Sequence, residues 1–219
     1  MSHALEASCR TLGQGDTERE VAGQISHRLL HRGAAPLNIT VLADGRSRLY
    51  RQAGFTSLPV EHNCMLVATA RKYGLCASAS RTMSFGKPDA ELQKEHDVAT
   101  RVSATYMASS WPDAIASEIL NVGRRIFQVS GMEHEWRLAP QGFVTGRAPI
   151  EQSFRPGKQD LIQAGWSLVW SPSAGGAASW DTFLVTDTGA RLMTSPDSWP
   201  QRRIRIQGTE ILRPDIFLR

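Results

Sequence analysis

The sequence predicts a single α+β domain, and three observations support this. Strand-like runs lie within residues 37–85, two helical stretches follow within 92–126, and a strand-rich segment begins at residue 166. Strands, then a helix pair, then strands again are typical of α+β folds. No repeat, low-complexity tract or linker divides the chain. A domain of 219 residues can bury about 70% of the surface of its extended chain, so neither a disulfide nor a metal is required for stability.

The first predicted helix begins at Asp16 or Thr17. Residues 1–15 are expected to be a loose lead-in, and residues 16–219 are expected to form the single domain. Acidic residues fill the first turn after this cap, which suits the helix dipole. Apolar residues then recur every four positions until Gly33, which predicts an amphipathic helix ending there.

Three strands are predicted next, over residues 37–42, 62–70 and 73–85. An Asp-Gly turn at 44–45 closes the first, and the break Gly-Lys-Pro at 86–88 ends the third. Successive side chains of a strand point to opposite faces of the sheet. This alternation places three small polar side chains on one face of the third strand, namely Cys76, Ser78 and Ser80.

Two helices are predicted after the strands. Residues 92–106 carry the apolar stripe of the first. Ser110 is expected to cap the second, with Pro112 early in its first turn and Asp113 near the positive end of its dipole. The region 133–151 is irregular and punctuated by glycine.

A hairpin organises the C-terminal part of the sequence. A strand over residues 166–170 meets a Pro/Gly-rich turn at 172–176, and a second strand follows over 178–186. The tight turn at 187–189 closes this second strand, and a last strand is predicted over 203–207. The hairpin and this last strand are therefore expected to complete the fold.

Composition excludes several classes of function. The net charge is +4, from 25 basic and 21 acidic residues, which is too weak and scattered to predict a nucleic-acid partner. The three cysteines, Cys9, Cys64 and Cys76, form neither a disulfide framework nor a CxxC metal pair. No signal peptide and no apolar run of about 20 residues is present, so we expect a cytoplasmic protein without a membrane partner.

The order of these features resembles the pita-bread superfamily of creatinase, methionine aminopeptidase and aminopeptidase P. The resemblance covers about residues 15–195. It rests on the sequence Gly-Asp-Thr-Glu-Arg-Glu-Val from residue 15, on Tyr73-Gly74 followed by Ser80-Arg81-Thr82, and on the hairpin from Trp170 to Gly189. It implies a curved, mostly antiparallel sheet backed by two helix pairs. It also implies a homodimer, because family members often pair.

The chain is more similar to a divergent, uncharacterised branch of peptidase-like proteins. That branch carries a strand ending in Ala-Arg-(Arg/Lys), a His-His-Gln-Gly-Gly-like segment and a terminal Trp-Pro. The corresponding segments here are Ala70-Arg71-Lys72, Ala139-Pro140-Gln141-Gly142-Phe143 and Trp199-Pro200.

The chemistry of the superfamily implies two divalent metals held by two aspartates, one histidine and two glutamates. Carried over one at a time, these positions fall near Ala68, on Ser78, on or near Pro140, on Ser171 and on Trp180. Uncharged side chains cannot offset the desolvation of a dication. We therefore expect no dinuclear metal, no cofactor and no active metalloaminopeptidase.

The leading hypothesis is a metal-free pseudoenzyme that keeps its cleft as a surface for a small molecule, a peptide or a protein partner. The alternative is a metal-independent hydrolase or lyase acting on a small amino-acid-like or guanidino substrate. A third interpretation is a metal site rebuilt from other residues. The catalytic candidates are Glu133, His134 and Asp181. The binding candidates in the cleft are Arg81, Cys76, Ser78, Ser171 and Trp180.

Each candidate also has a purely structural interpretation. Asp181 and Arg81 can be held in ion pairs rather than facing a ligand. Cys76 can be a small buried thiol. Trp180 can fill the void that the metals left, or it can form an apolar wall for a small ligand.

Overall fold

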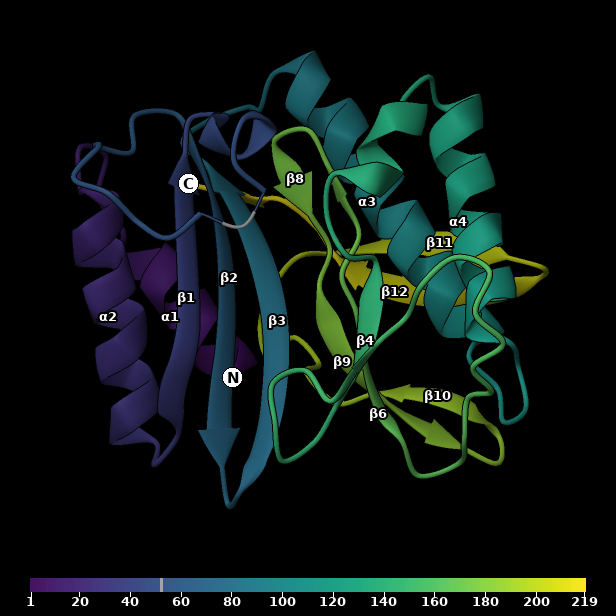
Figure 1. The fold of residues 1–219 in the computed structure, drawn as a ribbon. Helices are drawn as coiled ribbons and strands as arrows, with labels where there is room; N and C mark the ends of the chain where they lie inside the picture. Colours follow the sequence, from purple (N-terminus) through teal and green to yellow (C-terminus); the bar gives the residue numbers. More distant parts are fainter. Residues whose placement is uncertain (52) are drawn as a thin grey trace.

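A computed structural model describes residues 1–51 and 53–219, which form two halves that each combine a sheet with a pair of helices (Figure 1). In the first half, α1 (Ser2–Thr11) and α2 (Glu18–His31) cover a four-stranded sheet of order β1-β2-β3-β13. In the second half, α3 (Ala90–Ser109) and α4 (Ala116–Val129) accompany a five-stranded sheet of order β10-β9-β6-β4-β5. The predicted α+β class with two helix pairs is confirmed.

The strands of the first sheet are long. Its members are β1 (Ala35–Ala43), β2 (Asn63–Lys72), β3 (Leu75–Ser84) and β13 (Phe217–Leu218). β1, β2 and β3 pair antiparallel, as expected, whereas β13 lies parallel to the end of β3. Alternation along β2 and β3 sends one set of side chains to the α1–α2 core and the other set toward the second half.

The strands of the second half are shorter. They are β4 (Gly142–Thr145), β5 (Gln152–Ser153), β6 (Ser167–Trp170), β9 (Asp181–Thr186) and β10 (Gly189–Leu192). The predicted Pro/Gly-rich turn holds a small hairpin of β7 (Ser173–Ala174) and β8 (Ala177–Ala178). Two short 3₁₀ helices, η1 (Arg46–Arg48) and η2 (Glu133–Arg137), lie in connections.

The N-terminal segment differs from expectation. Residues 1–15 are not a loose lead-in, because Ser2–Thr11 form α1 and several of its side chains are fully buried. Leu5 and Cys9 belong to the same core cluster as α2 and β2. The apolar side chains of this helix bury against the sheet, and that burial stabilises it although it lacks a side-chain cap.

The predicted start of α2 is confirmed in detail. Thr17 accepts a hydrogen bond from the backbone N–H of Glu20, and the Glu20 carboxylate accepts one from the backbone of Thr17. This reciprocal capping box satisfies two of the backbone donors left free at a helix start.

The predicted start of α4 is wrong. α4 begins at Ala116, and Ser110 instead ends α3, where its hydroxyl donates to the Tyr106 carbonyl at 2.7 Å. Asp113 has φ +64°, a left-handed conformation that cannot continue a helix. Residues 111–115 are therefore a fixed turn between the two helices.

The C-terminal segment contains more strand than predicted. β11 (Gln201–Ile206) pairs with β12 (Thr209–Pro214) in a hairpin that packs on α3, as Figure 1 shows. Gln207, expected at the end of a strand, lies in the turn with φ +48°. Within the described residues, no helix combines the length and hydrophobicity that a membrane crossing requires.

We predict that two glycine-to-alanine changes in helices will have opposite effects. A Cβ at Gly123 of α4 would overlap the ring of the buried Tyr106, whereas one at the exposed Gly23 of α2 would meet open space. Gly23→Ala should stabilise the protein by up to about 1 kcal/mol through helix propensity. Gly123→Ala should destabilise it, because overpacking costs about 1–3 kcal/mol. Urea unfolding of both variants measures this, and equal stabilisation by both would contradict the packing shown here.

Candidate functional site

The polar face of β3 is bonded directly to the second half of the molecule. The backbone N–H of Ser78 donates to the Thr182 hydroxyl at 2.8 Å, and that hydroxyl donates to the Ser78 carbonyl at 2.9 Å. The backbone N–H of Ser80 donates to the Trp180 carbonyl at 2.9 Å, and the N–H of Trp180 donates to the Ser80 hydroxyl at 2.7 Å. These bonds join the two sheets where the cleft was expected.

The two aspartate positions hold hydroxyl groups that bond to each other. Thr69 lies opposite Ser78 in the β2–β3 register, and their hydroxyl oxygens are 2.7 Å apart. Both residues are buried. The prediction placed the first aspartate near Ala68, but Ala68 packs in the α1–α2 core, on the opposite face of the sheet. Its neighbour Thr69 faces the cleft.

The histidine position and the first glutamate position also meet. The Ser171 hydroxyl donates to the Pro140 carbonyl at 2.8 Å, and the Ser171 backbone N–H donates to the Gln141 carbonyl at 2.9 Å. Trp170 lies opposite Asp181 in the β6–β9 pairing, so Ser171 and Trp180 are the next residues beyond the paired strands. The predicted positions are therefore close together, as the resemblance required.

Trp180 occupies the space between the two sheets. It packs against a cluster of Leu42, Met65, Val67 and Ala178, which belong to β1, β2 and β8. Phe143 meets its ring edge-on, with ring centroids 6.4 Å apart. An indole packed among aliphatic side chains fills the volume that metal ligands would need.

The side chains present do not fit a dinuclear metal centre. The hydroxyls of Thr69, Ser78 and Ser171 already have protein partners, and no carboxylate or imidazole stands at these positions. Across residues 1–51 and 53–219, no group of three or more His, Cys, Asp or Glu is arranged to hold a metal ion. Hydroxyls and an indole are not ligands that divalent cations select.

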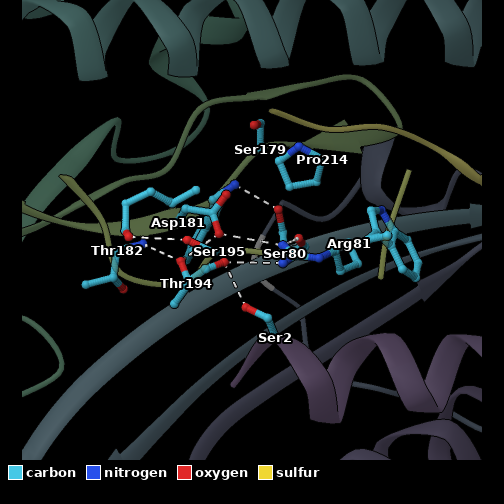
Figure 2. Close-up of polar contacts among 12 residues, drawn as sticks. Ser2, Ser80, Arg81, Ser179, Asp181, Thr182, Thr194, Ser195 and Pro214 are labelled. Carbon is cyan, nitrogen blue, oxygen red and sulfur yellow. Dashed lines mark hydrogen bonds and ion pairs between the residues drawn. The ribbon is translucent and has the colours of Figure 1, made fainter. Parts of the chain in front are cut away.

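A buried ionic network stands beside these residues (Figure 2). Asp181 accepts a hydrogen bond from the Thr194 hydroxyl at 2.7 Å and another from the Arg213 guanidinium. Arg81 Nη1 lies 3.6 Å from Asp181, and the Arg81 guanidinium also donates to Glu6 at 3.1 and 3.2 Å. All four charged side chains are 1% exposed or less.

This network links four elements: α1, β3, β9 and β12. Two arginines and two carboxylates balance in charge, which limits the cost of their burial. The cavity beside Arg81 and Asp181 has no room for a water molecule. Arg81 and Asp181 therefore pair with each other and with neighbouring elements of the fold, and neither faces an open pocket.

The remaining catalytic candidates lie elsewhere. Glu133 is on η2, where hydrogen bonds from Gln128 and Arg124 lower the pKa of its carboxyl. His134 is exposed and its Nε2 lies 3.2 Å from Glu135. Asp181 makes no contact with either residue in the described part of the chain. The structure does not assemble the predicted catalytic group.

Cys76 is buried at the start of β3. Its thiol contacts the Arg147 carbonyl at 3.6 Å, and its backbone N–H donates to the Gly146 carbonyl. A cysteine nucleophile needs an adjacent base. None of the hydrogen bonds described here joins Cys76 to a histidine.

Three arginines after β1 form ion pairs, two of which join the two halves, a feature that the sequence did not reveal. Arg46 pairs with Glu18 of α2 at 2.7 Å, and Arg48 pairs with Glu95 of α3 at 2.9 Å. Arg51 pairs with Glu135 of η2 at 2.6 Å. We call Arg46, Arg48 and Arg51 the arginine strap. Ala53 follows it in the chain and packs against the cluster that contains Trp180.

Comparison with known proteins supports the predicted fold. The sequence model of Metallopeptidase family M24 matches residues 1–187. The Xaa-Pro dipeptidase of Pyrococcus furiosus is 22% identical over 214 residues, which cover 89% of this chain and 58% of that protein. An uncharacterised peptidase of Staphylococcus saprophyticus is 20% identical over 201 residues, with 87% and 57% covered.

Solved structures show the same architecture. The prolidase from Pyrococcus furiosus superposes with a TM-score of 0.82 at 19% identity, covering 90% of this chain and 60% of its own. The X-Pro aminopeptidase from Thermotoga maritima gives 0.83 at 16% identity, covering 99% and 59%. The pita-bread fold is thus confirmed. The chain spans less than two thirds of the length of each of these relatives.

We predict that Asp181→Asn will be strongly destabilising. The change keeps the shape of the side chain but leaves Arg81 and Arg213 buried without their shared counter-charge. Loss of one partner from a buried ion pair costs about 3–5 kcal/mol. Glu133→Gln, which alters an exposed pair with Arg124, should change stability little. Urea unfolding measures both, and a small effect of Asp181→Asn would show that the network is not structurally important.

We predict that His96 makes the fold sensitive to acid. Burial is the main cause that lowers the pKa of His96 to about 4, with Asp215, Asp97 and Arg202 as its charged neighbours. An unfolded histidine titrates near pH 6.5, so the unfolded chain gains a proton before the folded chain does. Stability should therefore be complete above about pH 6.5 and fall as the pH drops toward about 4.

The measurement is urea unfolding at about pH 7 and about pH 4.5 for the wild type and His96→Gln. The wild type should lose more stability than the variant between these two conditions, since the variant has no imidazole to protonate. Parallel losses in the two proteins would assign the acid sensitivity to other groups.

Proposed function

The chain belongs to metallopeptidase family M24, and we propose that it is a pseudoenzyme of that family that binds a ligand or a protein partner rather than hydrolysing peptides with a dinuclear metal. This proposal rests on which residues occupy the positions that hold metal in the superfamily. Ser78 and Thr69 bond to each other, Ser171 bonds to Pro140, and Trp180 packs in an apolar cluster. These residues offer no anionic ligand for a metal ion, and it is a bound metal ion that would make water a nucleophile.

The burial of the cleft side chains also argues against the alternative, a metal-independent hydrolase or lyase. An enzyme of that kind needs an acid or base that reaches a substrate. Asp181 and Arg81 are buried in ion pairs, and Glu133 and His134 lie on η2 without contact to them. No feature of the described residues favours this alternative over the pseudoenzyme.

The arginine strap supports a non-catalytic role. Arg48 and Arg51 join the first half to α3 and η2 through ion pairs with Glu95 and Glu135, beside the cluster that contains Trp180. We propose that the protein acts in the cytoplasm, as a homodimer, through surfaces outside the closed cleft. Light scattering and sedimentation test the dimer.

The test of the proposed function combines metal analysis with a peptidase assay. Protein purified without chelator and incubated with Mn²⁺, Co²⁺ or Zn²⁺ should, after desalting, retain far less than one metal per chain. It should not hydrolyse Xaa-Pro dipeptides under conditions in which the Pyrococcus furiosus dipeptidase does. Two near-stoichiometric metals together with metal-dependent hydrolysis would overturn the proposal. Hydrolysis that persists with chelator would favour the metal-independent alternative.

A further inference from the structure

A hollow of about 620 Å³ lies outside the closed cleft, between the end of α3, strand β10 and the β11–β12 hairpin. The match to the family ends at residue 187, and most of the wall is built by residues after that point. None of the five metal positions lines the hollow. Its role is therefore independent of the proposed function.

Trp111 forms one side of the hollow and is 49% exposed. The turn between α3 and α4 fixes it: its indole N–H donates to the Ala108 carbonyl at 2.9 Å. Gly189 lies against the ring, where a Cβ would come within 3.3 Å of it. An aromatic side chain is thus held in place with part of its surface open, although burial of that surface would be favourable.

The opposite wall is the β11–β12 hairpin. Ile206, Ile211 and Leu212 line the hollow, together with Met107 and Leu192 from α3 and β10. These side chains make a mostly apolar pocket of the size that small molecules occupy. Contact with them would bury the body of such a molecule.

The charge in the lining has one sign. Glu210 is the acidic residue among the lining side chains, and no lysine, arginine or histidine lines the hollow. Arg203 reaches Glu210 at 3.3 Å, but it is itself 75% exposed, so solvent screens the pair. Exposed and half-buried side chains alternate along β11, where Arg203 and Arg205 are exposed and Ile204 and Ile206 are half-buried. Arg205 lies directly opposite Glu210 in the hairpin, but neither arginine is among the lining residues, so the lining itself presents an indole and a carboxylate and favours a positively charged ligand.

We propose that this pocket binds a small organic cation with an apolar body, such as a quaternary or tertiary amine. The apolar part packs on Ile211, Leu212 and Met107. The cationic head lies on the face of Trp111, where a cation–π contact contributes about 0.5–2 kcal/mol. Glu210 supplies the counter-charge. We choose this ligand class because no lysine, arginine or histidine lines the pocket to form an ion pair with an anion.

The test uses two probes that share one shape and differ in charge. These are 3-(trimethylammonio)phenol and its neutral isostere 3-tert-butylphenol, titrated into the full chain and followed by ¹H–¹⁵N NMR, which includes the tryptophan indole signals. The cation should bind about tenfold more tightly than the isostere and should shift the Trp111 indole signal. Benzoate, of opposite charge, should not bind. Equal affinity for the two isosteres, or no binding of the cation, would overturn the proposal.

Variants locate the site. Trp111→Ala should weaken binding of the cation about tenfold, because the cation–π contact is lost. Glu210→Gln should reduce the preference for the cation while leaving binding of the isostere unchanged. Trp136→Phe, in a different hollow, serves as the matched control and should bind like the wild type. The unbound spectra show that each variant is folded, and Trp111→Phe replaces Trp111→Ala if the latter is not. Unchanged binding in the Trp111 variant would place the ligand elsewhere.

Discussion

The ion pair between Asp181 and its two arginines is the interaction on which the arrangement of the two halves depends. Asp181 lies on β9, Arg81 on β3 and Arg213 on β12, so one carboxylate joins both sheets and the C-terminal hairpin. Glu6 extends the network to α1. Buried charges are stable only when their partners are exact in position. The network therefore sets the relative position of the halves, and the cleft between them follows from it.

The close contact of the two sheets reflects the chemistry of Thr69, Ser78 and Trp180. A carboxylate in this interior would need a cation or several donors to offset its desolvation. Hydroxyls on Thr69 and Ser78 need one partner each, and they find it in one another. An indole at residue 180 gains from contact with Val67 and Met65. These uncharged side chains pack directly against one another, and the ion pairs of Arg48 and Arg51 also join the two halves.

Sequence reasoning could place Ser78 on one face of a strand, and Ser171 and Trp180 on facing sides of a hairpin, because strand alternation and hairpin register are local properties. It placed the first aspartate near Ala68, whose side chain packs in the α1–α2 core, and a shift of one residue in a strand reverses the face. It missed Glu6 and Arg213 because their role depends on packing across the whole domain. Glu6 lies in a segment without a capping signal, and Arg213 is one of several arginines near the C-terminus. Among these, only Arg213 is completely buried, which no local pattern indicates.

Where side chains fill the space between the two sheets, any ligand must bind outside that space. The ion pairs inside this fold constrain where a ligand pocket can form. The strap and the ionic network occupy the interior, whereas the hollow lies at the outer surface, beside a hairpin that stands apart from both main sheets. The β11–β12 hairpin is such an element, since it pairs with neither of the two main sheets and rests on α3. The half-exposed Trp111, in the turn after α3, is the point where the α3–α4 scaffold and this hairpin meet.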